Sequence, residues 1–179
     1  TYKKEDLDYI NGSWVSYQHH SKFSGRDSTL VLQEINDEIL KAENALKTAS
    51  HFIITLGTSW VYRKKKDLQI VANCHKVAQH EFTKELLSLN EIKSSLTKMV
   101  TRIQSFNPEA RFIFTLSPVR HLKDGIQENS LSKARLLEAI HEVKDDNFVF
   151  YFPSYEIVMD DLRDYRFYNR DLIHPNEVA

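Results

Sequence analysis

The 179-residue chain is 41% hydrophobic, which supplies enough apolar side chains to bury one sizeable core. It is too short for two domains of ordinary size, so we expect a single domain over residues 1–179. Its 24 lysines and arginines nearly balance 25 aspartates and glutamates, which leaves a formal net charge of −1. Such a chain has no long-range field to hold nucleic acid or an anionic membrane surface, and we expect neither partner.

The single cysteine, Cys74, excludes an internal disulfide framework and a zinc site built from a cysteine cluster. One free thiol fits a reducing compartment, so we expect a cytoplasmic protein. No apolar run approaches the length of a membrane span, and the N-terminal segment TYKKEDLDYI lacks the apolar stretch of a signal peptide. We therefore expect a soluble chain without membrane insertion, whose oligomeric state stays open.

Amphipathic helical patterns alternate with short apolar runs along the chain. The first helix is predicted over roughly 28–48, with one apolar stripe made by Leu32, Ile35, Ile39, Ala42 and Leu46. A strand follows at 51–56 (HFIITL), and the basic run at 63–66 is expected at the tip of an exposed excursion. The next helix is predicted to follow Asn90 as its N-cap and to end near Asn107.

The second half of the chain continues the alternation. Strands are predicted at 111–116 (RFIFTL) and 147–152 (NFVFYF), with a helix between them that opens at Ser130. This order is typical of βαβ crossovers, so we predict a three-layer α/β/α sandwich around a mostly parallel sheet. Sites in such folds collect at the carboxyl ends of the strands.

Polar and small residues follow each predicted strand. These turns are Gly57-Thr58-Ser59-Trp60, Ser117-Pro118-Val119-Arg120-His121 and Pro153-Ser154-Tyr155-Glu156. Arg120 and Tyr155 are candidate substrate-binding residues. Asp171 and His174 lie on a polar loop expected to return to the same rim, with the segment 165–168 packed beneath it.

The Asp171-x-x-His174 spacing lets a carboxylate reach one imidazole nitrogen and leaves the other free to accept a proton from a nucleophile. This is the base half of a catalytic triad. Taken alone the pattern is weak, because a polar turn before a helix would use the same two residues without any chemistry.

Several blocks, taken in order, give the chain a family resemblance. ITLGTSWVY (54–62), NCHK (73–76), TLSPVRHLKDG (115–125), FPSYEIVMDDLRDYRFY (152–168) and DLIHP (171–175) resemble the GSCFA-domain family within the SGNH (GDSL-like) hydrolase superfamily. The resemblance implies a flavodoxin-like α/β fold and an ester hydrolase with a Ser-His-Asp triad. We expect no cofactor, and no metal either, because the eight histidines show no recognised ligand spacing. The substrate would be a small-molecule or glycan ester.

The resemblance implies a role for each matching position. His174 would be the general base and Asp171 would orient it. Gly57 and Thr58 match the superfamily's oxyanion block, and Ser59 stands where an asparagine usually helps to stabilise the oxyanion. Loss of such a donor can cost about 10²–10³ in rate. Cys74 and His75 match the Asn-Cys-His-Lys block, and they would line the site in a role that stays open.

The Gly-Ser-Cys-Phe-Ala stretch that names the family and holds its nucleophilic serine does not occur in residues 1–179. We therefore expect the serine and the first strand to lie upstream of Thr1, and this portion alone to be inactive. Internal candidates have simpler interpretations as loop, turn, cap or inert residues: Ser13, Ser59, Ser117, Ser130 with Lys133, and Cys74.

Two functions stay open at this point. The first is a serine-type hydrolase that acts through an acyl-enzyme. The alternative is a ligand-binding domain that keeps the fold and has weak or no catalysis, which the serine at position 59 favours. They differ in whether replacement of His174 abolishes function.

Overall fold

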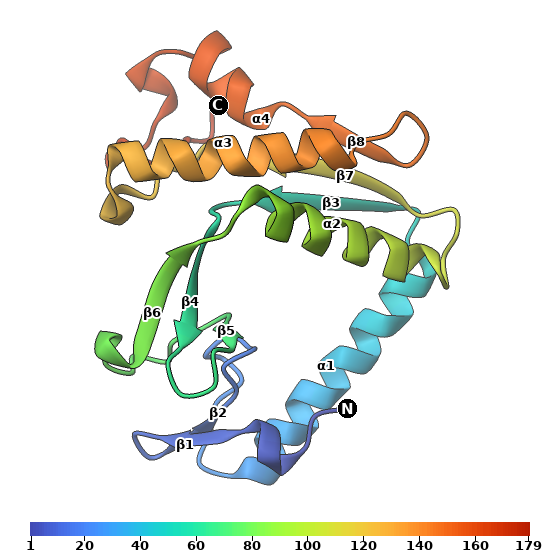
Figure 1. Cartoon of the computed structure of the whole chain (residues 1–179), viewed down its shortest axis with the longest axis vertical. Helices are drawn as coiled ribbons and strands as arrows, with labels where there is room; N and C mark the ends of the chain where they lie inside the picture. Colours follow the sequence, from blue (N-terminus) through green and yellow to red (C-terminus); the bar gives the residue numbers. More distant parts are fainter. The chain divides into compact units, whose positions relative to one another are not determined.

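Figure 1 shows the computed structural model, which describes residues 1–179. The chain divides into two units, and each is described by itself. The first comprises Thr1–Thr48 and Trp60–Glu85, and the second comprises Ala49–Ser59 and Leu86–Ala179. No helix in the chain combines the length and the hydrophobicity that a membrane span requires.

The first unit holds two small antiparallel sheets and one long helix. Strands β1 (Asp8–Ile10) and β2 (Ser13–Val15) form a hairpin, and β4 (Trp60–Lys64) lies between β5 (Ile70–Val71) and β6 (Phe82–Leu86). Helix α1 (Ser28–Thr48) occupies the predicted range. The basic run at 63–66 spans the end of β4 and the turn after it, close to the predicted tip.

The hairpin turn of the first unit is encoded by Asn11-Gly12. Both residues have positive φ, 49° and 82°, as a tight two-residue turn between twisted strands requires. Beyond the hairpin, Leu7, Val31 and Ile35 form a small core at the start of α1. Partly buried hydrophobic side chains surround it: Tyr2, Trp14, Phe23, Leu32 and Ile39.

The second unit is built on a three-stranded parallel sheet. Strand β7 (Arg111–Leu116) pairs with β3 (His51–Leu56) on one side and with β8 (Val149–Phe152) on the other. Two long helices, α2 (Leu89–Gln104) and α3 (Ile126–Val143), connect the strands. After β8 come a short helical segment, α4 (Ser154–Glu156), a π turn (Ile157–Asp161) and a 3₁₀ turn (Tyr165–Phe167).

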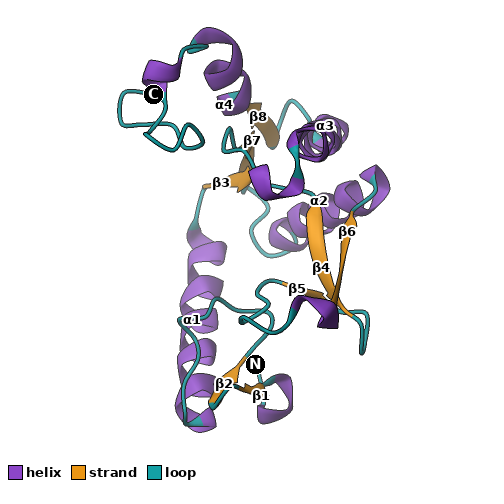
Figure 2. Ribbon diagram, turned by 90° about the vertical axis from the view of Figure 1, so that its left-hand side faces the viewer, coloured by secondary structure: helices purple, strands orange, loops and turns teal.

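The two faces of the parallel sheet differ in burial. Figure 2 shows α2 and α3 on the same side of the strands. Phe112, Phe114 and Leu116 of the central strand have no solvent exposure, whereas Ile53 on β3, whose side chain points to the other face, is 73% exposed. The mixed α/β fold around a parallel sheet is confirmed, and its core in this unit lies on the face of Phe114.

Two predicted helix starts and one strand start are wrong. Helix α2 begins after Ser88, not Asn90, because Ser88 and Glu91 form a reciprocal capping box. Helix α3 begins after Gly125, whose φ is 100°, so Ser130 lies inside the helix and donates its hydroxyl to the Ile126 carbonyl. Strand β8 begins at Val149 because the Asp145 carboxylate accepts the preceding backbone N–H groups in a turn.

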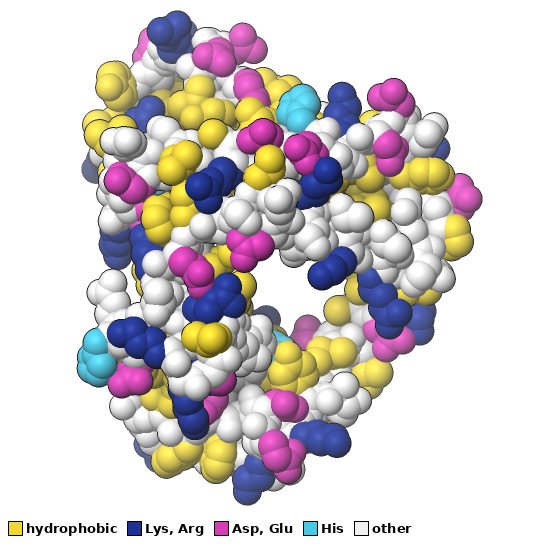
Figure 3. All heavy atoms as spheres, viewed as in Figure 1, with side chains coloured by type: hydrophobic (Ala, Val, Ile, Leu, Met, Phe, Trp, Pro, Cys, Tyr) yellow, Lys and Arg dark blue, Asp and Glu magenta, His cyan; other side chains and the backbone are white.

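Surface charge does not gather over the second unit on the face seen in Figure 3. Acidic and basic side chains alternate over α3, and an ion pair joins Lys93 to Glu142 with a 2.7 Å separation. This face of the unit offers no surface of one sign.

The unequal faces of the sheet give a stability prediction. Phe114→Ala should lower the free energy of unfolding by about 3–5 kcal/mol, because it leaves a cavity in a fully buried layer. Ile53→Ala is the matched control, and its loss should stay below about 1 kcal/mol. Urea denaturation followed by circular dichroism measures both, and equal losses would contradict this assignment of the buried face.

Candidate active site

The turns after the three parallel strands meet at one edge of the second unit. Leu56 and Leu116 are paired in register, and Ser117 donates its backbone N–H to the Leu56 carbonyl at 2.9 Å. Ser154, just after β8, donates its hydroxyl to the Leu116 carbonyl at 2.8 Å and also contacts the Thr115 hydroxyl. The edge predicted from the sequence therefore brings the Gly57, Ser117 and Ser154 turns together.

A buried lysine joins the first two turns. Lys133 of α3 is 3% exposed, and its Nζ donates to the Gly57 carbonyl at 2.7 Å and to the Ser117 carbonyl at 2.6 Å. Burial disfavours the charged form and lowers the pKa of this ammonium to about 8. Lys133 therefore places one positive charge beneath the carboxyl ends of β3 and β7.

Ser59 is part of the interior. It is 1% exposed, its backbone N–H donates to the Ser132 hydroxyl at 2.8 Å, and its own hydroxyl donates to the Ser132 carbonyl at 3.2 Å. The Thr58 hydroxyl lies 3.1 Å from the same Ser132 hydroxyl. In this arrangement the Ser59 side chain fixes the turn to α3 and has its hydroxyl committed there.

Gly57 lies against His121. A Cβ atom built on Gly57 would come within 3.5 Å of His121 Nε2, so any larger side chain would compete with the imidazole for this space. The His121 backbone N–H donates to the side-chain amide oxygen of the buried Asn129 at 3.0 Å, which ties the Ser117–His121 turn to α3.

Asp171 and His174 form the predicted pair. His174 Nδ1 lies 2.8 Å from Asp171 Oδ2, while Asp171 Oδ1 accepts the backbone N–H groups of Ile173 and His174 at 2.9 and 3.0 Å. These backbone bonds, joined by the imidazole, lower the pKa of Asp171 to about 2. The carboxylate stays ionised above that pH and fixes the ring, with Nδ1 as the proton-bearing nitrogen.

Backbone hydrogen bonds, more than aromatic packing, hold the Asp171–His174 loop. Tyr168 and Pro175 form an antiparallel bridge, and Asn169 donates its N–H to the His174 carbonyl at 2.8 Å. Leu172 adopts a positive φ of 58° at the tip. Of the segment 165–168, which the sequence predicts beneath the loop, Tyr168 forms the bridge and Phe167 accepts the Asn176 backbone N–H at 2.9 Å, whereas the Tyr165 side chain is 72% exposed.

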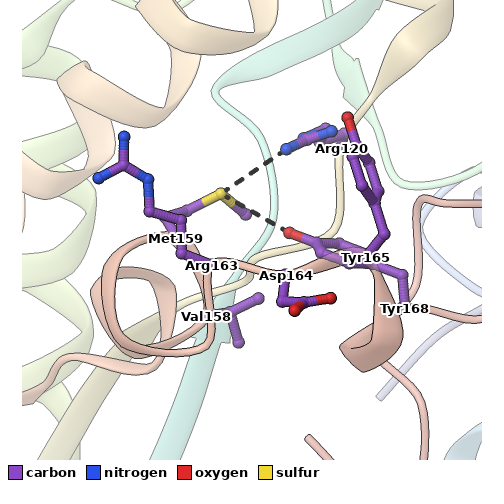
Figure 4. Close-up of a pocket in the computed structure, with 7 residues that line it drawn as sticks. All are labelled: Arg120, Val158, Met159, Arg163, Asp164, Tyr165 and Tyr168. Carbon is purple, nitrogen blue, oxygen red and sulfur yellow. Dashed lines mark hydrogen bonds between the residues drawn. The ribbon is translucent and has the colours of Figure 1, made fainter.

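A cavity of about 190 Å³ lies beside Tyr168, which precedes this loop, and Figure 4 shows the residues that line it. Arg120 lies on one side, and the other residues come from the segment after β8: Val158, Met159, Arg163, Asp164, Tyr165 and Tyr168. The Met159 sulfur faces both the Arg120 guanidinium, at 4.0 Å, and the Tyr168 hydroxyl, at 3.9 Å. Burial raises the pKa of the Tyr155 hydroxyl, and the positive charge of Arg120 opposes this rise.

Cys74 and His75 belong to the first unit, where they form a tight turn. His75 and Lys76 both have positive φ, 48° and 58°, and the Asn73 side chain accepts the His75 backbone N–H at 2.9 Å. His75 Nε2 lies 2.8 Å from the Ser16 carbonyl. Burial raises the pKa of the Cys74 thiol, which opposes formation of a nucleophilic thiolate.

The sequence analysis did not predict that Ser132 and Lys133 bond to the turns after β3 and β7. The available signal was the position of Lys133 within the apolar pattern of α3, three and seven residues before Leu136 and Ile140. A lysine on the buried stripe of a helix needs interior acceptors for its charge.

Lys133 gives a pH-dependent prediction. Its pKa is lower in the folded state than the ordinary value near 10.5, so the unfolded chain binds more protons between about pH 8 and 10.5 and stability rises across that range. Relative to Lys133→Met, the native chain should gain about 2 kcal/mol between pH 7 and pH 9.5. Urea titrations at both pH values measure this difference, and a constant difference would exclude a burial-lowered pKa.

The loop gives a second prediction. Asp171→Ala should speed amide hydrogen exchange at Ile173 and His174, because both N–H groups lose their acceptor. Asp171→Asn is the matched variant, since its amide oxygen still accepts both N–H groups while its partnership with His174 Nδ1 is lost or reversed. Exchange measured by NMR should separate the two variants, and equal exchange would show that Asp171 does not hold the loop.

Comparison with known proteins gives one match. No curated protein and no solved structure matches the chain. The model described as GSCFA family matches residues 1–179. The match covers every block on which the sequence resemblance was based, from the strand-end turns to the Asp171–His174 loop. The chain therefore belongs to the GSCFA family.

Proposed function

We propose that the protein is a serine-type hydrolase that cleaves a small-molecule or glycan ester. The observation that carries this proposal is the orientation of His174, whose Nδ1 is held by Asp171 while its Nε2 makes no hydrogen bond. The side chain of His174 is 56% exposed, so Nε2 can be reached by a nucleophile and a substrate.

The nucleophile in this proposal is a serine outside residues 1–179, as the family resemblance implies. Its hydroxyl oxygen bonds to the ester carbonyl carbon while His174 Nε2 accepts the proton. The carbon–oxygen bond to the alcohol then breaks, and His174 returns the proton to the departing alkoxide. Water attacks the acyl-enzyme by the same proton route, which releases the acid and restores the serine.

The residues of the second unit have distinct roles in this scheme. Asp171 keeps the proton on Nδ1 and stabilises the imidazolium, without itself accepting the proton. The Gly57–Ser59 turn contributes to oxyanion binding through its backbone, because the Ser59 hydroxyl is bonded to the Ser132 carbonyl. Lys133 beneath this turn adds a positive charge on the side where negative charge develops.

Because the Ser59 hydroxyl is bonded to the Ser132 carbonyl, the structure also favours the second function, a ligand-binding domain without strong catalysis. A turn that lacks a free side-chain donor supplies less stabilisation of a tetrahedral intermediate. In this alternative, Asp171 and His174 form a polar wall of a binding site, and replacement of His174 would change affinity without abolishing a reaction.

A covalent probe distinguishes the two functions. The full-length protein should form one adduct with a fluorophosphonate, and His174→Ala should slow its formation at least about 10²-fold, because the general base is lost. Intact-mass spectrometry over time gives both rates, and peptide mapping locates the serine.

The matched control is His51→Ala. This exposed histidine starts β3, at the end of the strand remote from the Gly57 turn, and labelling should proceed at the native rate. No adduct on the folded full-length protein at saturating probe would reject the hydrolase and favour the binding domain.

A further inference from the structure

Arg120 has an unusual set of partners. Its guanidinium carbon lies 5.6 Å from the centre of the Tyr168 ring, and one of its nitrogens lies 4.0 Å from the Met159 sulfur. A ring face and a thioether both attract a guanidinium, but neither is an anion. No carboxylate of the chain forms an ion pair with Arg120, so its five N–H donors lack a charged acceptor.

The one acidic residue in the cavity wall is already engaged. The Asp164 carboxylate accepts the Arg166 backbone N–H at 2.9 Å and lies 3.7 Å from the Arg166 guanidinium. Arg163 lies on the far side of the Met159 sulfur from Arg120 (Figure 4). Arg120 therefore supplies the single positive charge on its side of the cavity.

The base of the Arg120 side chain is fixed. Ser117 Oγ accepts the Val119 backbone N–H at 3.3 Å, and the next residue along, His121, is bonded through its backbone to Asn129. Tyr168 and Met159 contact the outer part of the side chain, which is exposed at the cavity. An arginine positioned at both ends loses less conformational entropy when it binds a ligand than a freely moving one does.

The cavity is connected to His174 through the backbone. Tyr168, which forms one wall, faces Pro175 across the bridge, and its neighbour Asn169 is bonded to the His174 carbonyl. For one substrate to use both groups, its ester must lie at His174 Nε2 and its other end toward Arg120. At about 190 Å³ the cavity is smaller than the 300–1,000 Å³ typical of drug-sized ligands, so it suits one short end of a substrate.

We propose that Arg120 binds a carboxylate on the substrate, so that this protein acts on esters that carry one negative charge. The inference rests on the proposed hydrolase function and names its substrate class. Guanidinium and carboxylate match as planar, bidentate partners. A single guanidinium on this side of the cavity matches one negative charge, so a monoanion suits it better than a doubly charged phosphate monoester. Val158 and Met159 supply apolar surface for a short aliphatic stem.

A matched pair of esters tests this proposal. 4-Nitrophenyl hexanoate and 4-nitrophenyl hemiadipate have acyl chains of the same length, and only the second ends in a carboxylate. The full-length protein should favour the hemiadipate in kcat/KM, and Arg120→Ala should reduce this preference by about 10- to 100-fold. Arg120→Lys should give an intermediate preference, because it keeps the charge without the bidentate geometry.

Arg102→Ala is the control, since this exposed arginine lies in the last turn of α2 and should leave the preference unchanged. If both esters are hydrolysed and Arg120→Ala keeps the native preference, the carboxylate proposal is wrong while the hydrolase stands. If a folded protein hydrolyses neither ester, binding of a monoanionic ligand tests the carboxylate proposal instead.

Binding is measured with monomethyl adipate on the His174→Ala protein, which avoids turnover. The amide signals of Tyr168 and Asn169 should shift in NMR spectra on addition of the monoanion, and the shifts should vanish when Arg120→Ala is added. Methyl hexanoate, the uncharged counterpart, should cause no comparable shift. Equal shifts with and without Arg120 would overturn the proposal whatever the outcome of the ester assays.

Discussion

The candidate site depends on one buried charge, the ammonium group of Lys133. It is bonded to the Gly57 and Ser117 carbonyls, directly after β3 and β7, and the adjacent Ser132 bonds to the Gly57–Ser59 turn. Two consecutive residues of α3 thereby fix the position of the helix relative to the carboxyl edge of the sheet. Because a charge is costly in the interior, any shift that broke these bonds would leave an uncompensated ammonium.

The His174 loop is stabilised differently, by bonds that close within its own sequence. Asp171 accepts from the two residues that follow the turn, and the Tyr168–Pro175 bridge closes the base of the loop. The imidazole is exposed, yet its orientation is defined by a carboxylate whose own position is set by backbone N–H groups. Rigid positioning at the surface is what a general base requires, since it must meet both a nucleophile and solvent water.

The sequence predicted the elements whose patterns are local and periodic. The strands at 51–56 and 111–116 and the helix at 28–48 have the predicted bounds, because short apolar runs and a three-to-four residue repeat leave few alternatives. The Asp171–His174 pairing also follows from local spacing. These features depend on residues close together in the chain.

The features that the sequence did not predict had two candidate residues for one role, or depended on residues far apart in the chain. Ser88 and Asn90 both suit an N-cap, and the partner Glu91 selects Ser88. Ser130 suits a helix start, but the helix begins earlier, directly after Gly125, which has a positive φ. The role of Lys133 could not be read locally, because its acceptors lie 76 and 16 residues away. The cavity beside Arg120 likewise joins segments that the sequence separates.

The cavity wall and His174 lie on one hairpin between Tyr168 and Pro175, which limits how the site can change in evolution. One end of this hairpin forms the wall beside Arg120, and the other carries the histidine. A substitution that tilts the hairpin to accept a larger ligand would therefore also displace the imidazole. Divergence of ligand preference in relatives should accordingly be confined to residues outside the hairpin, such as Val158 and Met159, where a wall can change without moving the base.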